Sequence, residues 1–342
     1  MSSNYMNYPN IFPADRTTAV NAALEKAFGN TVISEVTLLA GGLSGAPVYK
    51  IIAGDRPYVM KLDIPHANTA ADPFVKIALA AEAGIAPPLR YKNAEAGIII
   101  SEFIENKPVR AIFNGETLAV KLAEAVKKIH AVHYDVPGSD MKESVDRILG
   151  AFLQHRILSG PVPDECLQQY ERVKAVYPWA DTDKVFSHND LNPSNILCDG
   201  ETVWIIDWDT AFVNDRYVDL AGVANFFIHS PQQETAFLQT YFGEVDDYKS
   251  SRFYVMRQVS RIIYAMMMLQ LAARAKPADH AHDQQMEGMY LKDIGPLLGS
   301  GALSLATYEG QLSYGKALMN EAVQQMRTPR FEDALHLLGS SR

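Results

Sequence analysis

Two polar segments joined by a short apolar hairpin constrain this chain more than any other feature of its sequence. The first segment holds His188, Asp190 and, five residues after Asp190, Asn195. Apolar runs on both sides of an Asp-Gly-Glu turn within 196–206 then predict two short strands, and the second run ends at Asp207. We expect this hairpin to bring Asp190, Asn195 and Asp207 to one edge of a cleft.

These residue types at this spacing favour phosphoryl transfer. Protein kinases carry the same pattern as His-Arg-Asp, a later Asn, and then Asp-Phe-Gly. Because the phosphoryl group in transfer is highly charged, the protein mainly positions groups and neutralises charge. Asp190 would accept the proton of a substrate hydroxyl, and Asn195 and Asp207 offer the oxygen ligands that magnesium prefers. The alternative is a chance occurrence of polar residues in loops, where such residues are common.

The pattern along the rest of the chain predicts a small N-terminal lobe and a larger helical lobe. In the first lobe we expect helices and strands that form a small antiparallel sheet with helix packed on it: helices at 14–28 and 72–83, and strands at 31–39, 47–52, 57–62, 89–91 and 97–102. From about residue 105 helical periodicity dominates. We therefore expect an α+β, two-lobed, protein-kinase-like fold with an N-lobe at 1–104 and a mainly helical C-lobe at 105–342.

A glycine-rich loop between the first two expected strands is a candidate phosphate-binding loop. It contains Gly41, Gly42, Leu43 and Ser44, and glycine lets backbone N–H groups approach phosphate oxygens closely. Taken alone, such a loop is more typical of an ordinary hairpin turn. Lys61 ends the third expected strand, as does the lysine that pairs with ATP phosphates in kinases. A solvated strand end is the alternative for this lysine.

The expected link between the lobes follows an apolar strand. In a kinase-like cleft, the backbone of this link contacts the edge of adenine. We therefore expect nucleotide contacts at Glu102, Phe103 and Ile104.

Composition excludes several classes of protein. The formal net charge of −9 argues against a nucleic-acid partner, which favours a basic face. No apolar run reaches the roughly 18 residues of a membrane span, and the first residues have no signal-peptide pattern. The two cysteines form no C-x-x-C motif, so we expect neither a disulfide framework nor a zinc site. A cytoplasmic protein without a membrane partner is the simplest expectation.

Over nearly its whole length, the sequence resembles the superfamily of aminoglycoside phosphotransferases and choline kinases, the small-molecule relatives of protein kinases. Besides the glycine-rich loop, the resemblance is carried by Lys61 and by the segments 81–87, 188–197, 207–209 and 214–221. It is closest in appearance to bacterial choline- and ethanolamine-kinase-like proteins. The catalytic motif is specific to the superfamily but says little about the acceptor.

The resemblance implies a role for each matching residue. Asp190 would be the base, Asn195 and Asp207 the magnesium ligands, and Lys61 a ligand of ATP phosphates. His188 would brace the catalytic loop. ATP and magnesium are thus the implied cofactors.

Two acidic positions qualify this correspondence. Asp219 would be a structural acid that bonds to the backbone of the catalytic loop. The helix glutamate that pairs with the ATP lysine in the family should fall near residue 73, where this chain has none. Either Asp72 pairs with Lys61, or that pairing is absent in the resting state.

The acceptor is the least determined part of the prediction. Choline-like cations are held by aromatic faces and an acid, which makes Asp209 and Trp208 candidate acceptor contacts. Further aromatic candidates, whose helical spacing is more typical of a core, are Tyr217, Phe226, Phe227, Tyr241, Tyr254 and Tyr264. We expect a small-molecule alcohol, foremost an amino alcohol such as choline or ethanolamine. The alternatives are an aminoglycoside or other small-alcohol kinase, and a catalytically weak nucleotide-binding pseudokinase. The sequence assigns no oligomeric state.

Overall fold

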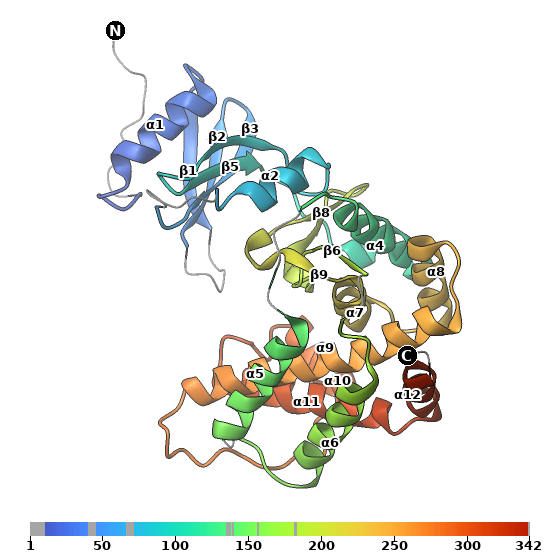
Figure 1. Cartoon of the computed structure of the whole chain (residues 1–342). Helices are drawn as coiled ribbons and strands as arrows, with labels where there is room; N and C mark the ends of the chain where they lie inside the picture. The colour runs from blue at the N-terminus through green and yellow to red at the C-terminus, as the bar shows by residue number, and fades with distance from the viewer. Residues whose placement is uncertain are drawn as a thin grey trace.

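The chain folds into a sheet-containing part and a mainly helical part, as the α+β prediction requires (Figure 1). The computed structural model describes residues 11–39, 46–65, 72–134, 138, 140–155, 157–180 and 183–340. The sheet lies at one end of the molecule, and most of the helices gather at the other (Figure 1).

The N-terminal sheet is antiparallel throughout and has the strand order β1-β2-β3-β5-β4. Its strands are β1 (Ile33–Leu39), β2 (Val48–Ala53), β3 (Arg56–Leu62), β4 (Leu89–Asn93) and β5 (Ile98–Glu102). Helix α1 (Thr17–Phe28) packs on β4 and β5. The apolar residues of α1 recur every three or four positions, so Val20 and Leu24 enter one core with Ile51 and Met60 of the strands. The predicted elements of this lobe are confirmed, with ends shifted by a few residues.

Helix α2 (Val75–Glu82) belongs to a second hydrophobic core, which lies in the helical part. Its Ala80, together with Ile85 and Ala86 just after it, packs with the helices of the C-terminal part. The backbone N–H of Ile205 also donates to the carbonyl oxygen of Ile85 (2.9 Å). The segment around α2 is therefore fastened to the helical part, and the lobe boundary at residue 104 stays a prediction.

The predicted hairpin of the catalytic region is confirmed. Strands β7 (Ile196–Cys198) and β8 (Val203–Ile205) pair antiparallel. A second ribbon, of β6 (Lys184–Ser187) and β9 (Phe212–Asp215), adjoins the catalytic segment. Strand β9 was not predicted, because four residues with two polar ones at the end give no clear alternation.

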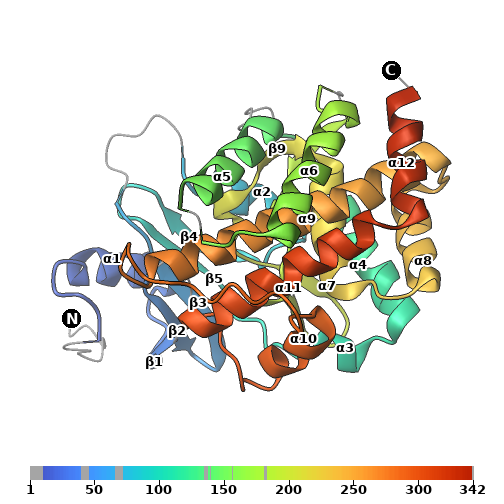
Figure 2. The ribbon, with the colours of Figure 1, turned by 90° about the horizontal axis from the view of Figure 1, so that it is seen from below.

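The helical part is organised around the long helix α9 (Asp247–Arg274), which lies alongside α11 (Tyr308–Met326) (Figure 2). Helices α5 (Met141–His155), α7 (Arg216–Phe227) and α12 (Pro329–Ser340) also pack against α9. The other helices of this part are α3 (Val109–Ile112), α4 (Gly115–His130), α6 (Pro161–Val176), α8 (Pro231–Phe242) and α10 (Leu291–Gly299). In the described part of the chain, no helix has the length and apolar character to cross a membrane.

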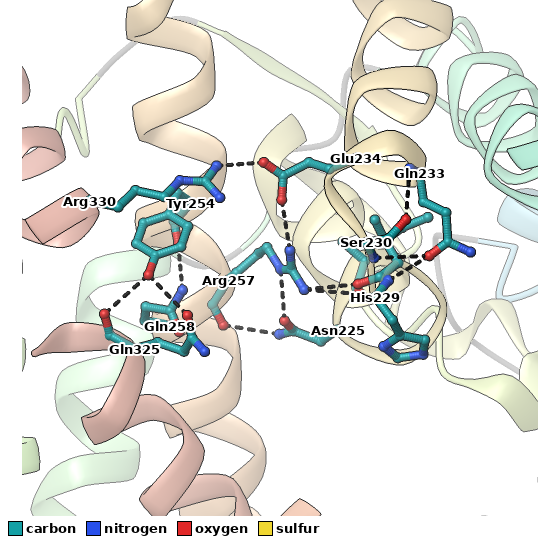
Figure 3. A network of polar contacts seen from close by, with 12 residues as sticks. Asn225, His229, Ser230, Gln233, Glu234, Tyr254, Arg257, Gln258, Gln325 and Arg330 are labelled. Atoms are coloured by element: carbon teal, nitrogen blue, oxygen red, sulfur yellow. Dashed lines mark hydrogen bonds and ion pairs between the residues drawn. The ribbon is translucent and has the colours of Figure 1, made fainter. Parts of the chain in front are cut away.

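A polar network around Arg257 ties four of these helices together (Figure 3). From α9, Arg257 donates to Glu234 of α8 (3.0 Å) and to the carbonyl oxygens of Ala224 and Ile228 at the end of α7. Arg330 of α12 donates to the other oxygen of Glu234. Glu234 thus balances the largely buried Arg257 and the exposed Arg330, and its pair with Arg257 offsets the cost of burying that charge.

Candidate active site

The carboxylate of Asp190 is held by side chains from the catalytic loop and from α9. Its Oδ1 accepts hydrogen bonds from the Tyr264 hydroxyl (2.7 Å) and from Asn192 Nδ2 (3.0 Å). Asn195 Nδ2 donates to Asp190 Oδ2 (3.2 Å) and to its backbone oxygen (2.9 Å). Burial and then Asp190 raise the pKa of Tyr264 well above its ordinary value, so the phenol stays protonated and donates. The carboxylate is therefore held in one orientation and half-buried, as a positioned base requires.

Asn195 and Asp207 offer a donor set that fits a magnesium ion. The amide nitrogen of Asn195 faces Asp190, which leaves its oxygen directed away from that carboxylate. Partial desolvation, and next the charge of Asp209, raise the pKa of Asp207, so an added cation at this carboxylate would be favourable. One amide oxygen and one carboxylate are hard ligands of the kind that magnesium combines with water and phosphate oxygens.

Backbone strain marks the same two segments. Among the described residues, Asn189 (φ 66°) and Asp207 (φ 64°) are the non-glycine residues with positive φ. Asn and Asp tolerate this region better than most residues, but it remains unfavourable. Such strain is retained where the surrounding structure enforces it, commonly at functional sites.

The catalytic loop is braced by two buried side chains, His188 and Asp219. His188 is fully buried, and its Nε2 lies 3.0 Å from the carbonyl oxygen of Ile206. Asp219 accepts the backbone N–H groups of His188 (2.8 Å) and Asn189 (2.7 Å), and His130 Nε2 lies 3.1 Å from it. Burial alone would raise the pKa of Asp219, but these partners lower it, so it is ionised.

Lys61 pairs with Asp209 and not with Asp72. Its Nζ lies 2.8 Å from Asp209 Oδ2 and 3.8 Å from Asp63. Asp72 instead pairs with Lys92 (2.7 Å), so the predicted alternative of an Asp72–Lys61 pair is wrong. Burial alone would lower the pKa of Lys61, but the carboxylates of Asp209, Asp63 and Asp207 raise it. The lysine is therefore protonated and positively charged. Asp209, expected beside the acceptor, therefore faces Lys61.

The structure places Trp208 in the core and not at an acceptor surface. The side chain is 3 % exposed, and its Nε1 donates to the carbonyl oxygen of Ile205 (3.0 Å). Its ring stacks on Phe186 and meets His188 edge-on. The expectation that Trp208 contacts the substrate is therefore wrong, because its indole packs on Phe186 and His188 and supports the catalytic loop from the core.

The aromatic candidates divide between core and surface. Tyr217, Phe227, Tyr241 and Tyr254 are buried core residues. Phe226 and Tyr264 are half-buried, and their rings meet edge-on at 5.8 Å. The sequence analysis missed the contact of Tyr264 with Asp190, because the two residues are 74 positions apart and no local pattern joins them.

The predicted nucleotide contacts are described only in part. Gly41, Gly42, Leu43 and Ser44 lie outside the described residues. Three others form the end of β5 and the link after it: Glu102, Phe103 and Ile104. The N–H of Glu102 donates to Pro88 (2.9 Å) and that of Phe103 to Pro57 (3.3 Å). These two amides serve the sheet, so carbonyl groups and the Ile104 amide are the better candidates for contacts with a base.

Comparisons with solved structures show the fold. A choline/ethanolamine kinase family protein from Mesorhizobium loti is 19 % identical, with 95 % of this chain and 99 % of that chain covered and a TM-score of 0.64. An ethanolamine kinase from Plasmodium vivax is 16 % identical, with 95 % and 92 % covered and a TM-score of 0.57. A spectinomycin phosphotransferase bound to ADP and spectinomycin is 14 % identical, with 96 % and 99 % covered and a TM-score of 0.57. The two-lobed kinase-like prediction is confirmed.

Sequence comparison gives the family. An uncharacterized protein from Metamycoplasma hominis is 26 % identical over 145 residues, which are 42 % of this chain and 28 % of that protein. The chain thus matches little more than a quarter of the length of that relative. The family model described as "Phosphotransferase enzyme family" matches residues 35–254, more than half of the chain. The chain therefore belongs to the phosphotransferase enzyme family.

Proposed function

We propose that this protein transfers the γ-phosphoryl group of ATP, with magnesium, to a hydroxyl group of a small polar molecule. The bond between the γ-phosphorus and the ADP oxygen breaks, a bond to the acceptor oxygen forms, and the hydroxyl proton passes to Asp190. The observation that carries the proposal is the oriented carboxylate of Asp190, which Tyr264 and Asn195 fix. The backbone N–H of Ile206, next to the strained Asp207, donates to the carbonyl oxygen of Asn195 (3.0 Å) and so holds the two segments together. Positioning and charge neutralisation are what this reaction asks of a protein.

Asn195 and Asp207 would hold magnesium, which neutralises charge on the phosphate oxygens. Lys61 is a raised-pKa cation on β3 and would bind the phosphates, with the loop at 41–44 covering them. Residues 102–104 would contact the base. Both cysteines are buried and free, which fits a reducing compartment, and we propose the cytoplasm.

For the acceptor we propose an amino alcohol such as choline or ethanolamine. The solved structures with a similar fold include kinases named for both compounds. Spectinomycin phosphotransferase shares the fold as well, so an aminoglycoside is the second candidate. An intact set of Asp190, Asn195 and Asp207 weighs against a pseudokinase.

The test is phosphotransfer from magnesium-ATP to a panel of choline, ethanolamine, aminoglycosides, methylthioribose, homoserine and thiamine, read as ADP release. One strong acceptor supports the proposal and gives the substrate class. ATP binding without transfer to any acceptor, and without slow ATP hydrolysis that Asp190→Asn abolishes, would contradict it.

Replacing Lys61 by alanine should weaken ATP binding at least about tenfold and also lower turnover, because a charge-assisted contact to phosphate is lost. Calorimetric titration with magnesium-ATP and steady-state kinetics measure the two effects. Lys92→Ala, which removes a lysine from another ion pair on the same face of the sheet, two strands away, is the control. Unchanged ATP affinity in Lys61→Ala would show that the ATP phosphates do not contact Lys61.

Replacing Asp209 by asparagine should tighten ATP binding by up to about fivefold, because the carboxylate competes with phosphate for Lys61 in a half-exposed ion pair. The same calorimetric titration measures this change. Asp72→Asn provides the matched control, since its pair with Lys92 has similar geometry away from Lys61. Weaker binding in Asp209→Asn would mean that Asp209 supports the nucleotide.

A further inference from the structure

A small cavity lies next to the catalytic loop, among α5, α7 and α9. Its volume is about 130 Å³. Its wall includes Asn189 and Leu191, the chain neighbours of Asp190, and Tyr264, whose hydroxyl donates to Asp190. The cavity is thus adjacent to the group that would deprotonate the acceptor. We call it the Gly222 pocket after a glycine in its wall.

The lining of the Gly222 pocket is mostly apolar, and its polar side chains are the uncharged Ser144, Asn189, Asn214, Ser260 and Tyr264. Most of its surface comes from side chains such as Met141, Ile148, Val218, Met256 and Ile263. Among the described residues that line it, none has a charged side chain. Alkyl groups gain from burial in such surroundings, whereas an unpaired charge loses hydration at high cost.

Gly222 leaves room in this pocket. It lies inside α7 and is buried, yet a Cβ added to it would meet no atom within 4 Å. Glycine in a helix interior is unfavourable relative to alanine. Neither a close approach nor a positive φ requires glycine at this position. The open space that it leaves in the pocket is the feature that distinguishes it from alanine.

We propose that the Gly222 pocket holds the end of the acceptor remote from its reacting hydroxyl, and that it selects a compact branched alkyl surface by shape and not by charge. This inference rests on the proposed function and narrows its substrate class. A cavity of roughly 150 Å³ lined by apolar side chains takes up a benzene-sized group. The trimethylammonium end of choline presents only methyl groups at its surface, and no carboxylate lines the described wall to read its charge.

The first experiment compares three acceptors on the wild-type protein. They are choline, its neutral carbon isostere with a tert-butyl end, and ethanolamine. We expect the isostere to equal or exceed choline in kcat/KM, and ethanolamine to fall at least about tenfold below both, since its small end leaves the pocket unfilled. A strong preference for choline over the isostere would overturn the proposal, because it would show that the site reads charge.

The second experiment fills the pocket. Gly222→Val should lower kcat/KM for the two branched acceptors about tenfold more than for ethanolamine. Gly222→Ala should also weaken the branched acceptors while raising the melting temperature by about 2 °C, because alanine favours the helix. A loss of turnover in a more stable protein cannot result from misfolding. Gly150→Ala, at an exposed glycine of α5 with open space around its Cβ, is the control for the helix effect alone.

A binding measurement separates this inference from the proposed function. Calorimetric titration of the tert-butyl isostere, without ATP, should show binding that Gly222→Val abolishes. Equal loss of all three acceptors in Gly222→Val, or isostere binding that Gly222→Val leaves unchanged, would overturn the pocket assignment while transfer stands. Absence of both alcohol phosphorylation and ATP hydrolysis in the wild type would overturn the proposed function. In that case, binding of the isostere and its loss in Gly222→Val would still test whether the Gly222 pocket takes up a branched alkyl group.

Discussion

Replacing Asp190 by alanine should lower kcat about a thousandfold and leave ATP affinity nearly unchanged, because a positioned base acts mainly in the transfer step. The contacts explain why the two effects separate. Asn195 Nδ2 also donates to the backbone oxygen of residue 190 (2.9 Å), so the magnesium ligand keeps an anchor in the variant. Steady-state kinetics with the best acceptor and calorimetric titration with magnesium-ATP measure the two quantities.

The control is Asp333→Ala, which removes an exposed acid from α12. It should change neither quantity. Asp190→Asn keeps the size of the side chain but cannot accept the proton, so it should resemble Asp190→Ala. Full activity in either Asp190 variant would show that the base is assigned to the wrong residue.

Replacing Asp219 by alanine should lower the free energy of unfolding by about 3 kcal/mol and also reduce turnover, because it leaves buried donors without an acceptor. The donors are the N–H groups of His188 and Asn189, and His130 Nε2 also loses its partner. Urea unfolding measures the first effect. Because the catalytic loop loses its brace, kcat should fall more than ATP affinity.

The pH dependence gives a check that a simple packing defect would not. The pKa of Asp219 in the folded protein is lowered. The contribution of Asp219 to the free energy of unfolding is therefore fully present above the ordinary aspartate pKa of about 4, and it is lost as the pH falls through the lower pKa of the folded state. The difference in unfolding free energy between wild type and Asp219→Ala should therefore shrink at acidic pH. Asp219→Asn keeps one acceptor oxygen and should show a smaller loss. An Asp219→Ala protein as stable as the wild type would exclude a bracing role.

Local patterns predicted the elements that carry the site. Apolar runs on both sides of the turn at 199–201 indicated the β7–β8 hairpin, and the three-to-four spacing indicated α1. In each case the signal lies within a few residues of sequence, and burial of one face makes it strong. The fold class followed from the succession of strands and then helices.

Contacts between distant segments could not be read in the same way. The partner of Lys61 was sought in the helix at 72–83, as in related kinases, yet the structure supplies Asp209, 148 positions away. Trp208 beside Asp207 suggested a substrate contact, but a short 3-10 turn directs the indole back onto Phe186. Tertiary packing, and not local spacing, decides both side-chain positions.

The hydrogen bond between Ile205 and Ile85 makes a single amide report on the contact between the α2 segment and the β7–β8 hairpin. Strand β8 carries this amide, while β7 is fixed to the link through Asn106 and Lys107, which bond to Cys198. A backbone amide exchanges its hydrogen for deuterium only when its hydrogen bond opens. Deuterium uptake at Ile205 therefore follows separation of the α2 segment from the hairpin, whether or not a reaction occurs. Ligands that stabilise this contact would be recognised by slower uptake at this one position.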